Sequence, residues 1–415
     1  MLNSSAYALK TLGLVTTAVA LALAAYRPAL AEGPKRFDSD DYQRRQHTLY
    51  VNANITTGNA ILAYDIQADG SLHALPGSPF LTGGSGFFDP SFALGPFDVD
   101  QEMALYNNVL YAVNDGSNTI SALQIGDDGS LFPLPGQPFT SGGSTPVSLG
   151  LHGRYLVTVD SAQDPAQAGK GYRPGLIASE IKRDGGLRLL PGSAVALAAD
   201  AQPSQALTSN TGPFVFAAEF PGGGHLDAFV QAPNGRLIQT DTTMLPLDAD
   251  GKQPLPLGLW ANPRAPYLYV GFVNTNELGV YTVTAAGKLQ FVNKASNSGA
   301  ALCWIRTSSD GRFLYTVNTG DQSMSVYDLS DPASPVEIQH IVVGGTGGVE
   351  QFSLTPDEHF LYLLEQVNSP ASVQEDNRLF VLEIDAHTGM LKLLDGLTTV
   401  LPVPANTRPF GVTVR

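Results

Sequence analysis

The chain has 415 residues, 43% of them hydrophobic, and a formal net charge of −15 at pH 7. Acidity of this size repels nucleic acid and anionic lipid, so neither is expected as a partner. The 43 Gly and 29 Pro indicate many tight turns. Cys303 is the single cysteine, which excludes an intramolecular disulfide and cysteine-rich metal sites.

The N-terminal segment has the three parts of a secretory signal peptide. Lys10 precedes an apolar run from Leu12 to Ala25, and the small-x-small sequence Ala29–Ala31 follows it. The run is too short for a membrane-spanning helix, which needs about 20 apolar residues. We therefore expect cleavage after residues 1–31, a flexible lead-in at residues 32–46, and an exported chain, periplasmic or secreted, without a membrane span.

Seven related apolar, aromatic segments follow along the chain. They begin at residues 49, 110, 155, 214, 268, 314 and 361, so that successive starts are 45 to 61 residues apart. This period is typical of propeller blades. A second run after each segment alternates apolar and polar residues, as a half-buried strand does. Six of the seven then reach a Gly-containing hairpin turn, of which Asp69–Leu72 is the first.

A ten-residue phrase occurs twice, as LPGSPFLTGG at residues 75–84 and as LPGQPFTSGG at residues 134–143. It continues the third strand of its repeat, and its prolines cannot donate to a β-ladder. We therefore expect the phrase to mark the outer edge strand of a small sheet, blunted against pairing with other chains. A Gly-rich crossing then leads into a fourth apolar segment before the next repeat.

Four strands per repeat, seven repeats and no helical period predict an all-β fold. The expected architecture is a seven-bladed β-propeller of four-stranded antiparallel blades over residues 47–415, as a single domain and a monomer. The first repeat lacks an inner strand, and Arg408–Arg415 resembles an inner strand with no repeat after it. The N- and C-terminal strands are therefore expected to close the ring within one blade.

Several repeats resemble known propellers. Leu110–Ile125 is similar to YVTN-type repeats, and three later segments resemble the seven-bladed lactonase family: Ser308–Asn318, Thr355–Gln366 and Asn377–Leu394. That family includes propeller-type 6-phosphogluconolactonases and carboxymuconate-lactonising enzymes. The resemblance covers nearly the whole expected mature chain. It implies hydrolysis or isomerisation of a small lactone by His, Arg and a carboxylate at the channel mouth, with no cofactor.

The family's proposed catalytic positions are matched only in part. Its His-bearing phrase corresponds to Gln202–Leu207, which has no His, and its Gly-Pro-Arg-His phrase to Pro254–Trp260, which has neither Arg nor His. Glu219 corresponds to the family's acidic residue. Trp304 stands where the family often has Glu, and Arg306 is kept.

Opening a lactone needs a base to activate water and cations to hold the developing oxyanion. Glu219 is the predicted base, and Arg306 and Arg408 are the predicted cations. The predicted substrate-binding residues are Gln205, Trp304 and Glu350. The alternative interpretation is structural, with Glu219 capping a loop and the arginines solvated or inter-blade. The seven histidines lack metal-ligand spacing, so no metal site is expected.

Two functions stay open at this point. One is an exported lactonase-like enzyme, which the family resemblance favours. The other is a non-catalytic propeller that binds a protein, glycan or small ligand on its top face, which the missing His and Arg favour. A cluster of Glu219 with both arginines in a closed channel pocket indicates catalysis, whereas a flat apolar top face indicates binding.

Overall fold

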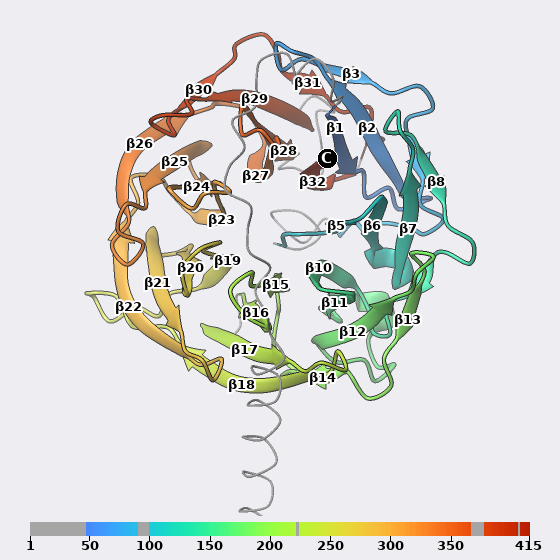
Figure 1. Cartoon of the computed structure of the whole chain (residues 1–415), viewed down its shortest axis with the longest axis horizontal. Coiled ribbons are helices and arrows are strands. Elements are labelled where there is room, and N and C mark those ends of the chain that lie inside the picture. The colour runs from blue at the N-terminus through green and yellow to red at the C-terminus, as the bar shows by residue number, and fades with distance from the viewer. Residues whose placement is uncertain (1–46, 90–98, 221–223, 367–376, 406) are drawn as a thin grey trace, which may run out of the picture.

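Seven small sheets stand in a closed ring around a central axis (Figure 1). The computed structural model describes residues 47–89, 99–220, 224–366, 377–405 and 407–415. In this part of the chain the helical elements are two short 3-10 turns, η1 (Asp115–Ser117) and η2 (Pro165–Gln167). None of its helices is long and apolar enough to cross a membrane. The expected signal peptide and lead-in lie outside the described residues.

The strands of blades one to three are as follows. Blade one has β1 (Thr48–Asn52), β2 (Ala60–Ile66), β3 (Leu72–Ala74), β4 (Phe80–Leu81) and the last strand, β32 (Phe410–Val414). Blade two has β5 (Met103–Tyr106), β6 (Val109–Asn114), β7 (Thr119–Ile125), β8 (Leu131–Pro133) and β9 (Phe139–Thr140). Blade three has β10 (Pro146–His152), β11 (Tyr155–Asp160), β12 (Gly175–Ile181), β13 (Leu187–Leu189) and β14 (Val195–Ala196).

The remaining four blades continue in chain order. Blade four has β15 (Leu207–Thr208), β16 (Phe214–Glu219), β17 (His225–Gln231) and β18 (Leu237–Met244). Blade five has β19 (Pro256–Ala261), β20 (Tyr267–Phe272), β21 (Glu277–Val283) and β22 (Leu289–Ser296). Blade six has β23 (Leu302–Thr307), β24 (Phe313–Asn318), β25 (Ser323–Asp328) and β26 (Val336–Val342). Blade seven has β27 (Gly348–Leu354), β28 (Phe360–Gln366), β29 (Arg378–Ile384), β30 (Leu391–Leu393) and β31 (Thr399–Val400).

The predicted seven-bladed propeller of four-stranded antiparallel sheets is confirmed. In every blade the strands run antiparallel from the axis to the rim, and the inner strand of blade one comes from the C-terminus. Strand β32 pairs with β1 from Leu49↔Val414 to Asn52↔Phe410. The expected closure of the ring by both terminal strands is therefore also confirmed.

Apolar side chains are buried between neighbouring blades, because each thin sheet presents one apolar face to each neighbour. Phe216 of blade four and Phe272 of blade five are both fully buried in one such cluster. Burying a side chain of this size stabilises the fold by about 1.5–3 kcal/mol. The blades are thus held by their neighbours, which is why a single blade cannot form a core alone.

Tyrosine hydroxyls join one blade to the next at regular intervals. In five blades a tyrosine at the start of the second strand from the axis donates to a backbone carbonyl in a hairpin turn of the following blade. The bonds run from Tyr50 to Gly129 (2.8 Å), Tyr111 to Gly185 (2.6 Å), Tyr155 to Pro233 (3.0 Å), Tyr269 to Pro332 (3.0 Å) and Tyr362 to Gly70 (2.9 Å). The repeated tyrosine-containing segments and the repeated turns are therefore hydrogen-bonded to each other between successive blades.

The repeated ten-residue phrase forms the split outer strand and the joint to the next blade. Its first copy contains β4, which pairs with β2 after the strand has broken between β3 and β4. The hydroxyl of Thr82 then donates to Asn114 Oδ1 of blade two (2.7 Å), and in the second copy Ser141 donates to Asp160 Oδ1 of blade three (2.7 Å). The prediction that the phrase marks an outer edge is confirmed.

All seven outer edges are interrupted, by one of two devices. In blades one, two, three and seven the outer strand is split into two short pieces. In blades four, five and six it is continuous, but a register shift marks a bulge in β18, β22 and β26. Both devices disturb the row of free backbone groups that otherwise invites pairing with another chain.

Candidate functional site

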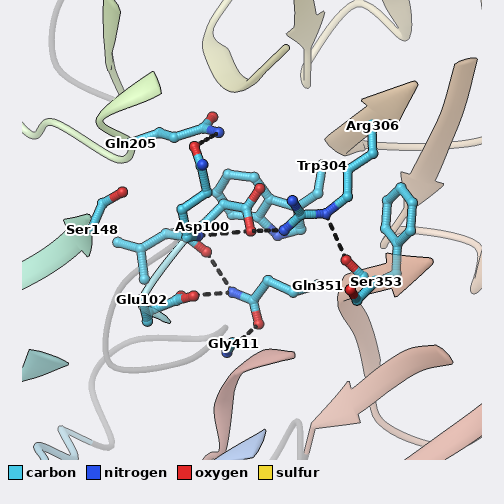
Figure 2. A network of polar contacts seen from close by, with 12 residues as sticks. Asp100, Glu102, Ser148, Gln205, Trp304, Arg306, Gln351, Ser353 and Gly411 are labelled. Atoms are coloured by element: carbon cyan, nitrogen blue, oxygen red, sulfur yellow. Dashed lines mark hydrogen bonds and ion pairs between the residues drawn. The ribbon is translucent and has the colours of Figure 1, made fainter. Parts of the chain in front are cut away.

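A ring of equivalent residues surrounds the axis where the inner strands begin. Strand register gives each blade one residue in this ring: Gly411, Glu102, Ser148, Gln205, Gly258, Trp304 and Gln351. Figure 2 shows the polar members converging from different blades. Two of the three predicted substrate-binding residues, Gln205 and Trp304, belong to this ring.

The ring residues of blades three and four hydrogen-bond to the next inner strand. Ser148 Oγ accepts from the backbone N–H of Ala206 (3.0 Å). Gln205 Oε1 accepts from the N–H of Leu259 (2.7 Å), and its Nε2 donates to the carbonyl of the same residue (3.1 Å). Because inner strands of different blades do not pair, these side chains supply the cross-links that a β-ladder supplies elsewhere.

The ring residues of blades six and seven also hydrogen-bond to the next inner strand. Trp304 Nε1 donates to Glu350 Oε2 at 3.3 Å, and Gln351 Oε1 accepts from the N–H of Gly411 at 3.2 Å. Trp304, Glu350 and Gln351 are buried. Gly411 packs closely against Glu102, since a Cβ added to it would lie 3.0 Å from Glu102 Oε2. The predicted substrate-binding residues Trp304 and Glu350 therefore contact each other in the channel wall.

The segment Val99–Glu102, which leads into β5, crosses the channel and contacts several blades. Gln351 Nε2 donates to Glu102 Oε1 (3.0 Å) and to the carbonyl of Val99. Gln205 Nε2 donates to Gln101 Oε1 (2.7 Å). Figure 2 shows these contacts as dashed lines that meet on the segment. The segment lies in a linker that no repeat pattern covers, so its role could not be predicted from the sequence.

Arg306 forms an ion pair with Asp100 of this segment. Its Nη2 lies 3.2 Å from Asp100 Oδ1, and its Nε donates to the carbonyl of Phe352 (2.7 Å). The guanidinium also lies 5.0 Å from the Trp260 ring centroid and 5.9 Å from that of Phe352, within the range of cation–π attraction. The charge of this predicted catalytic cation is thus already matched by a carboxylate.

Burial controls the protonation of the two carboxyl groups on the segment. It raises the pKa of Asp100, and the nearby charge of Arg306 opposes that rise. Burial raises the pKa of Glu102 well above its ordinary value, and the charge of Asp100 raises it further. Glu102 therefore favours the neutral acid, while Arg306 favours the ionised form of Asp100.

Arg408, the other predicted cation, is fully buried before β32. Its guanidinium lies 5.1 Å from the ring centroid of Phe88. Its backbone carbonyl accepts from Asn54 Nδ2 (3.1 Å), which joins the C-terminal strand to blade one. Arg408 is thus built into the closure of the ring.

Glu219, the predicted base, lies at the end of β16 and outside the network of Figure 2. It forms an isolated bridge with Pro203 and is the register partner of His225 across the β16–β17 ladder. The pKa of Glu219 is raised to about 7, first by burial. The hydrogen bond to Asp227, the charge of Asp227 and the charge of Asp200 contribute to the same rise. The three predicted catalytic residues therefore do not form one cluster: Arg306 pairs with Asp100, and Glu219 with Asp227.

Two members of the Glu219 group were not predicted. The positions that correspond to the family's His carry no His, yet strand register brings His225 directly opposite Glu219. Asp227 follows two residues later on the same strand and is buried. Their signal in the sequence is the alternation of His225 and Asp227 in a run that directly follows the Glu219 strand.

A second group has the residue types of a catalytic triad without its geometry. His340 Nε2 lies 2.8 Å from Ser323 Oγ and 3.3 Å from Asp321 Oδ2. A triad uses the two different ring nitrogens for these partners. Ser323 is also fully buried, so its hydroxyl is out of reach of a substrate. The group is therefore a polar contact and not a nucleophilic centre. In the described ranges, no three His, Cys, Asp or Glu side chains are grouped as metal ligands.

Comparison with known proteins finds similarity to propeller lactonases. The family model described as "Lactonase, 7-bladed beta-propeller" matches residues 239–361 and 297–405. A 6-phosphogluconolactonase of Pectobacterium atrosepticum is 23% identical over 337 residues, which cover 74% of this chain and 84% of that protein.

Solved structures agree on the architecture. A putative 6-phosphogluconolactonase from Bacteroides uniformis superposes with a TM-score of 0.65 at 17% identity, covering 89% of this chain and 100% of the other. The periplasmic gluconolactonase of Pseudomonas aeruginosa gives a TM-score of 0.63 at 17% identity, covering 88% and 99%. The chain is thus a seven-bladed β-propeller that is similar to the seven-bladed β-propeller lactonases, through the family model in its later repeats and a relative over most of its length.

Proposed function

We propose that this propeller hydrolyses a small lactone near the channel mouth and that Glu219 is the general base. The observation that carries the proposal is the buried Glu219–Asp227 pair, in which the pKa of Glu219 is raised to about 7. A base works best when its pKa lies near the working pH. Glu219 forms a bridge with Pro203, and the carbonyl of the next residue, Ser204, accepts from the N–H of Asp100 (3.2 Å). Glu219 therefore lies at the same end of the ring as the polar network of Figure 2, which we call the axial network.

In the proposed reaction, ionised Glu219 takes a proton from water as the water oxygen bonds to the lactone carbonyl carbon. The tetrahedral oxyanion collapses, the bond to the ring oxygen breaks, and the proton passes to that oxygen to give a hydroxy acid. Arg306 and Arg408 are the proposed oxyanion stabilisers. For Arg306 this role requires exchange of its Asp100 contact for the substrate. Gln205, Trp304 and Glu350 remain the proposed substrate contacts.

The test is a lactone panel with the purified protein. We expect turnover of at least one aliphatic, sugar or phosphorylated sugar lactone, measured by acid release at constant pH. Glu219→Gln should lower kcat by on the order of 10²–10⁴-fold, because it keeps the shape and removes the base. Glu277→Gln is the matched control, since Glu277 lies at the same end of blade five and pairs with Lys294 (2.9 Å). Full activity of Glu219→Gln excludes this residue.

The second candidate is a non-catalytic propeller that binds a ligand on its top face. One observation favours it: Arg306 pairs with Asp100 and Glu219 with Asp227, so the predicted base and this cation do not share the cluster that a catalytic site would need. A folded protein that turns over no lactone of the panel supports this candidate.

Export is also proposed, on the sequence of residues 1–31 alone. Intact-mass analysis of the protein from the culture medium or periplasm should show a chain that begins at Glu32. A membrane-bound chain that still contains Leu12–Ala25 contradicts the proposal.

A further inference from the structure

We propose that Asp227 is a positioning residue that controls the proton on Glu219 and so sets the pH range of the reaction. This inference rests on the function proposed above. It assigns a role to a buried carboxylate outside the axial network and outside the predicted site.

Strand register places Glu219, His225 and Asp227 on one face of blade four. In the β16–β17 ladder Glu219 is opposite His225, and Ala217 is opposite Asp227. Residues opposite each other in an antiparallel pair share a face, and so do residues two apart on one strand. Ala217 packs in the core cluster that faces blade three. The two carboxyl groups therefore meet diagonally across the ladder, where long side chains still reach each other.

Hydrogen bonds from β18 hold the carboxyl group of Asp227 in a fixed position. Its Oδ1 accepts from Gln239 Nε2 (2.9 Å) and from Thr242 Oγ1 (2.7 Å), both on β18. Its Oδ2 is buried, and no donor from the described residues satisfies it. Two buried carboxyl groups in contact cannot both be ionised at low cost. Asp227 accordingly raises the pKa of Glu219, which burial already raises, through its hydrogen bond and its charge.

The charges around Glu219 are predominantly negative. Besides Asp227, Asp200 of the linker before β15 raises the pKa of Glu219, and no arginine or lysine contributes to the shift. His225 lies opposite on β17, the facing groups of β18 are the neutral Gln239 and Thr242, and blade three presents apolar Leu176 and Val195. Asp227 is therefore the principal partner that the chain offers to this proton.

The first test is a direct titration of Glu219 by ¹³C NMR of side-chain carboxyl groups. The Glu219 signal is identified by its loss in Glu219→Gln. In Asp227→Asn the midpoint should fall by about one pH unit or more, because the charge that disfavours ionisation is gone. Asp241→Asn is the matched control: Asp241 pairs with Ala228 and so lies on the opposite face of the same blade. An unchanged midpoint in a folded Asp227→Asn variant overturns the inference.

A second variant covers the case in which Asp227→Asn does not fold. Thr242→Val removes one of the hydrogen bonds that position the Asp227 carboxyl group, which weakens its contact with Glu219. The Glu219 midpoint should fall in this variant as well, by less than in Asp227→Asn. A midpoint that stays at the wild-type value overturns the inference.

Activity gives an independent readout. If Glu219 is the base, kcat/KM falls below the Glu219 pKa, and Asp227→Asn should move this acidic limb to lower pH by the shift seen in the titration. A shifted titration without lactone turnover supports the proton pair and rejects the proposed function. A titration shift with turnover but an unmoved acidic limb rejects the link between Asp227 and the reaction.

Discussion

A single position in the repeat shows how one residue changes the chemistry of a blade joint. Asn114 of blade two and Asn318 of blade six end the second strand and donate to hydroxyls on the third strand. Blade three has Asp160 at this place, and Ile177 where blade two has the Ser121 acceptor. Ile177 offers no hydroxyl to accept from an amide N–H₂ there, and the Asp160 carboxyl accepts from Ser141, as the Asn114 amide oxygen accepts from Thr82. Burial accordingly raises the pKa of Asp160 to about 7.

Asp160→Asn should flatten the pH dependence of stability. The unfolded pKa is about 3.9, and the folded value is about 7. The wild type therefore loses stability as pH rises from about 4 to about 7, by at most on the order of 4 kcal/mol. The variant lacks this loss but carries an amide without an acceptor, so it should be the less stable protein near pH 4, with the deficit shrinking or reversing by pH 8. Urea unfolding from pH 4 to pH 8 measures both; parallel curves contradict the prediction.

Residues of the site could be predicted only where a pattern or a resemblance marked them. Glu219 could be predicted because a family position marks it, but its pKa is raised by burial and then by Asp227, which only strand register brings near. Asp100 pairs with Arg306, but it lies in a linker between repeats, where no periodic pattern gives a position. The chemistry of side chains across blades depends on register and crossing segments, which composition and period do not determine.

At the scale of elements, hairpin turns and second strands form a chain of contacts around the ring. Each tyrosine hydroxyl bond described above joins a strand of one blade to a turn of the next. The bond from Tyr362 to Gly70 joins blade seven to blade one across a sequence separation of 292 residues. The Gly at the end of the repeated phrase acts at the same joints, since a Cβ on Gly84 would lie 2.4 Å from Asn114 Cγ. The phrase is repeated because the joint is repeated.

Tyr362→Phe should destabilise the closure of the ring. The change leaves the buried carbonyl of Gly70 without this donor, which costs about 1–3 kcal/mol. Tyr64→Phe is the matched control, because the buried hydroxyl of Tyr64 has no hydrogen-bond partner in the described part of the chain. Urea unfolding should show a lower midpoint for Tyr362→Phe and an equal or higher one for Tyr64→Phe. Equal midpoints for the two variants contradict the prediction.

At the scale of the whole molecule, the architecture could be predicted almost completely. The seven Leu-Tyr-type segments gave the number of blades, and the unmatched Arg408–Arg415 gave the closing strand. The two edge devices could be predicted only in part: the prolines of the phrase indicated a blunted edge, but the bulges in β18, β22 and β26 left no residue-type signal. The fold could be predicted from the repeats, because blades that pack only on their neighbours must form a ring of similar units.

Deleting Thr407–Arg415 should abolish cooperative folding. The deletion removes β32, exposes the β1 edge and opens the contacts between β32 and β27. We expect aggregation or a broad, non-cooperative thermal transition by circular dichroism. Removal of residues 1–31 is the control truncation and should leave the transition unchanged. A deletion variant that melts like the full chain contradicts the closing role of β32.

The pairing of β1 with β32 also bears on the kinetics of folding. The ring Nδ1 of His47 lies 3.1 Å from the carbonyl of Arg415, and 368 residues separate the two in sequence. Closing so long a loop has a large entropic cost, and long-range strand pairs form slowly. Until β32 pairs with β1, blade one lacks its inner strand and the ring stays open. Ring closure is therefore expected to be the slow, late step of folding.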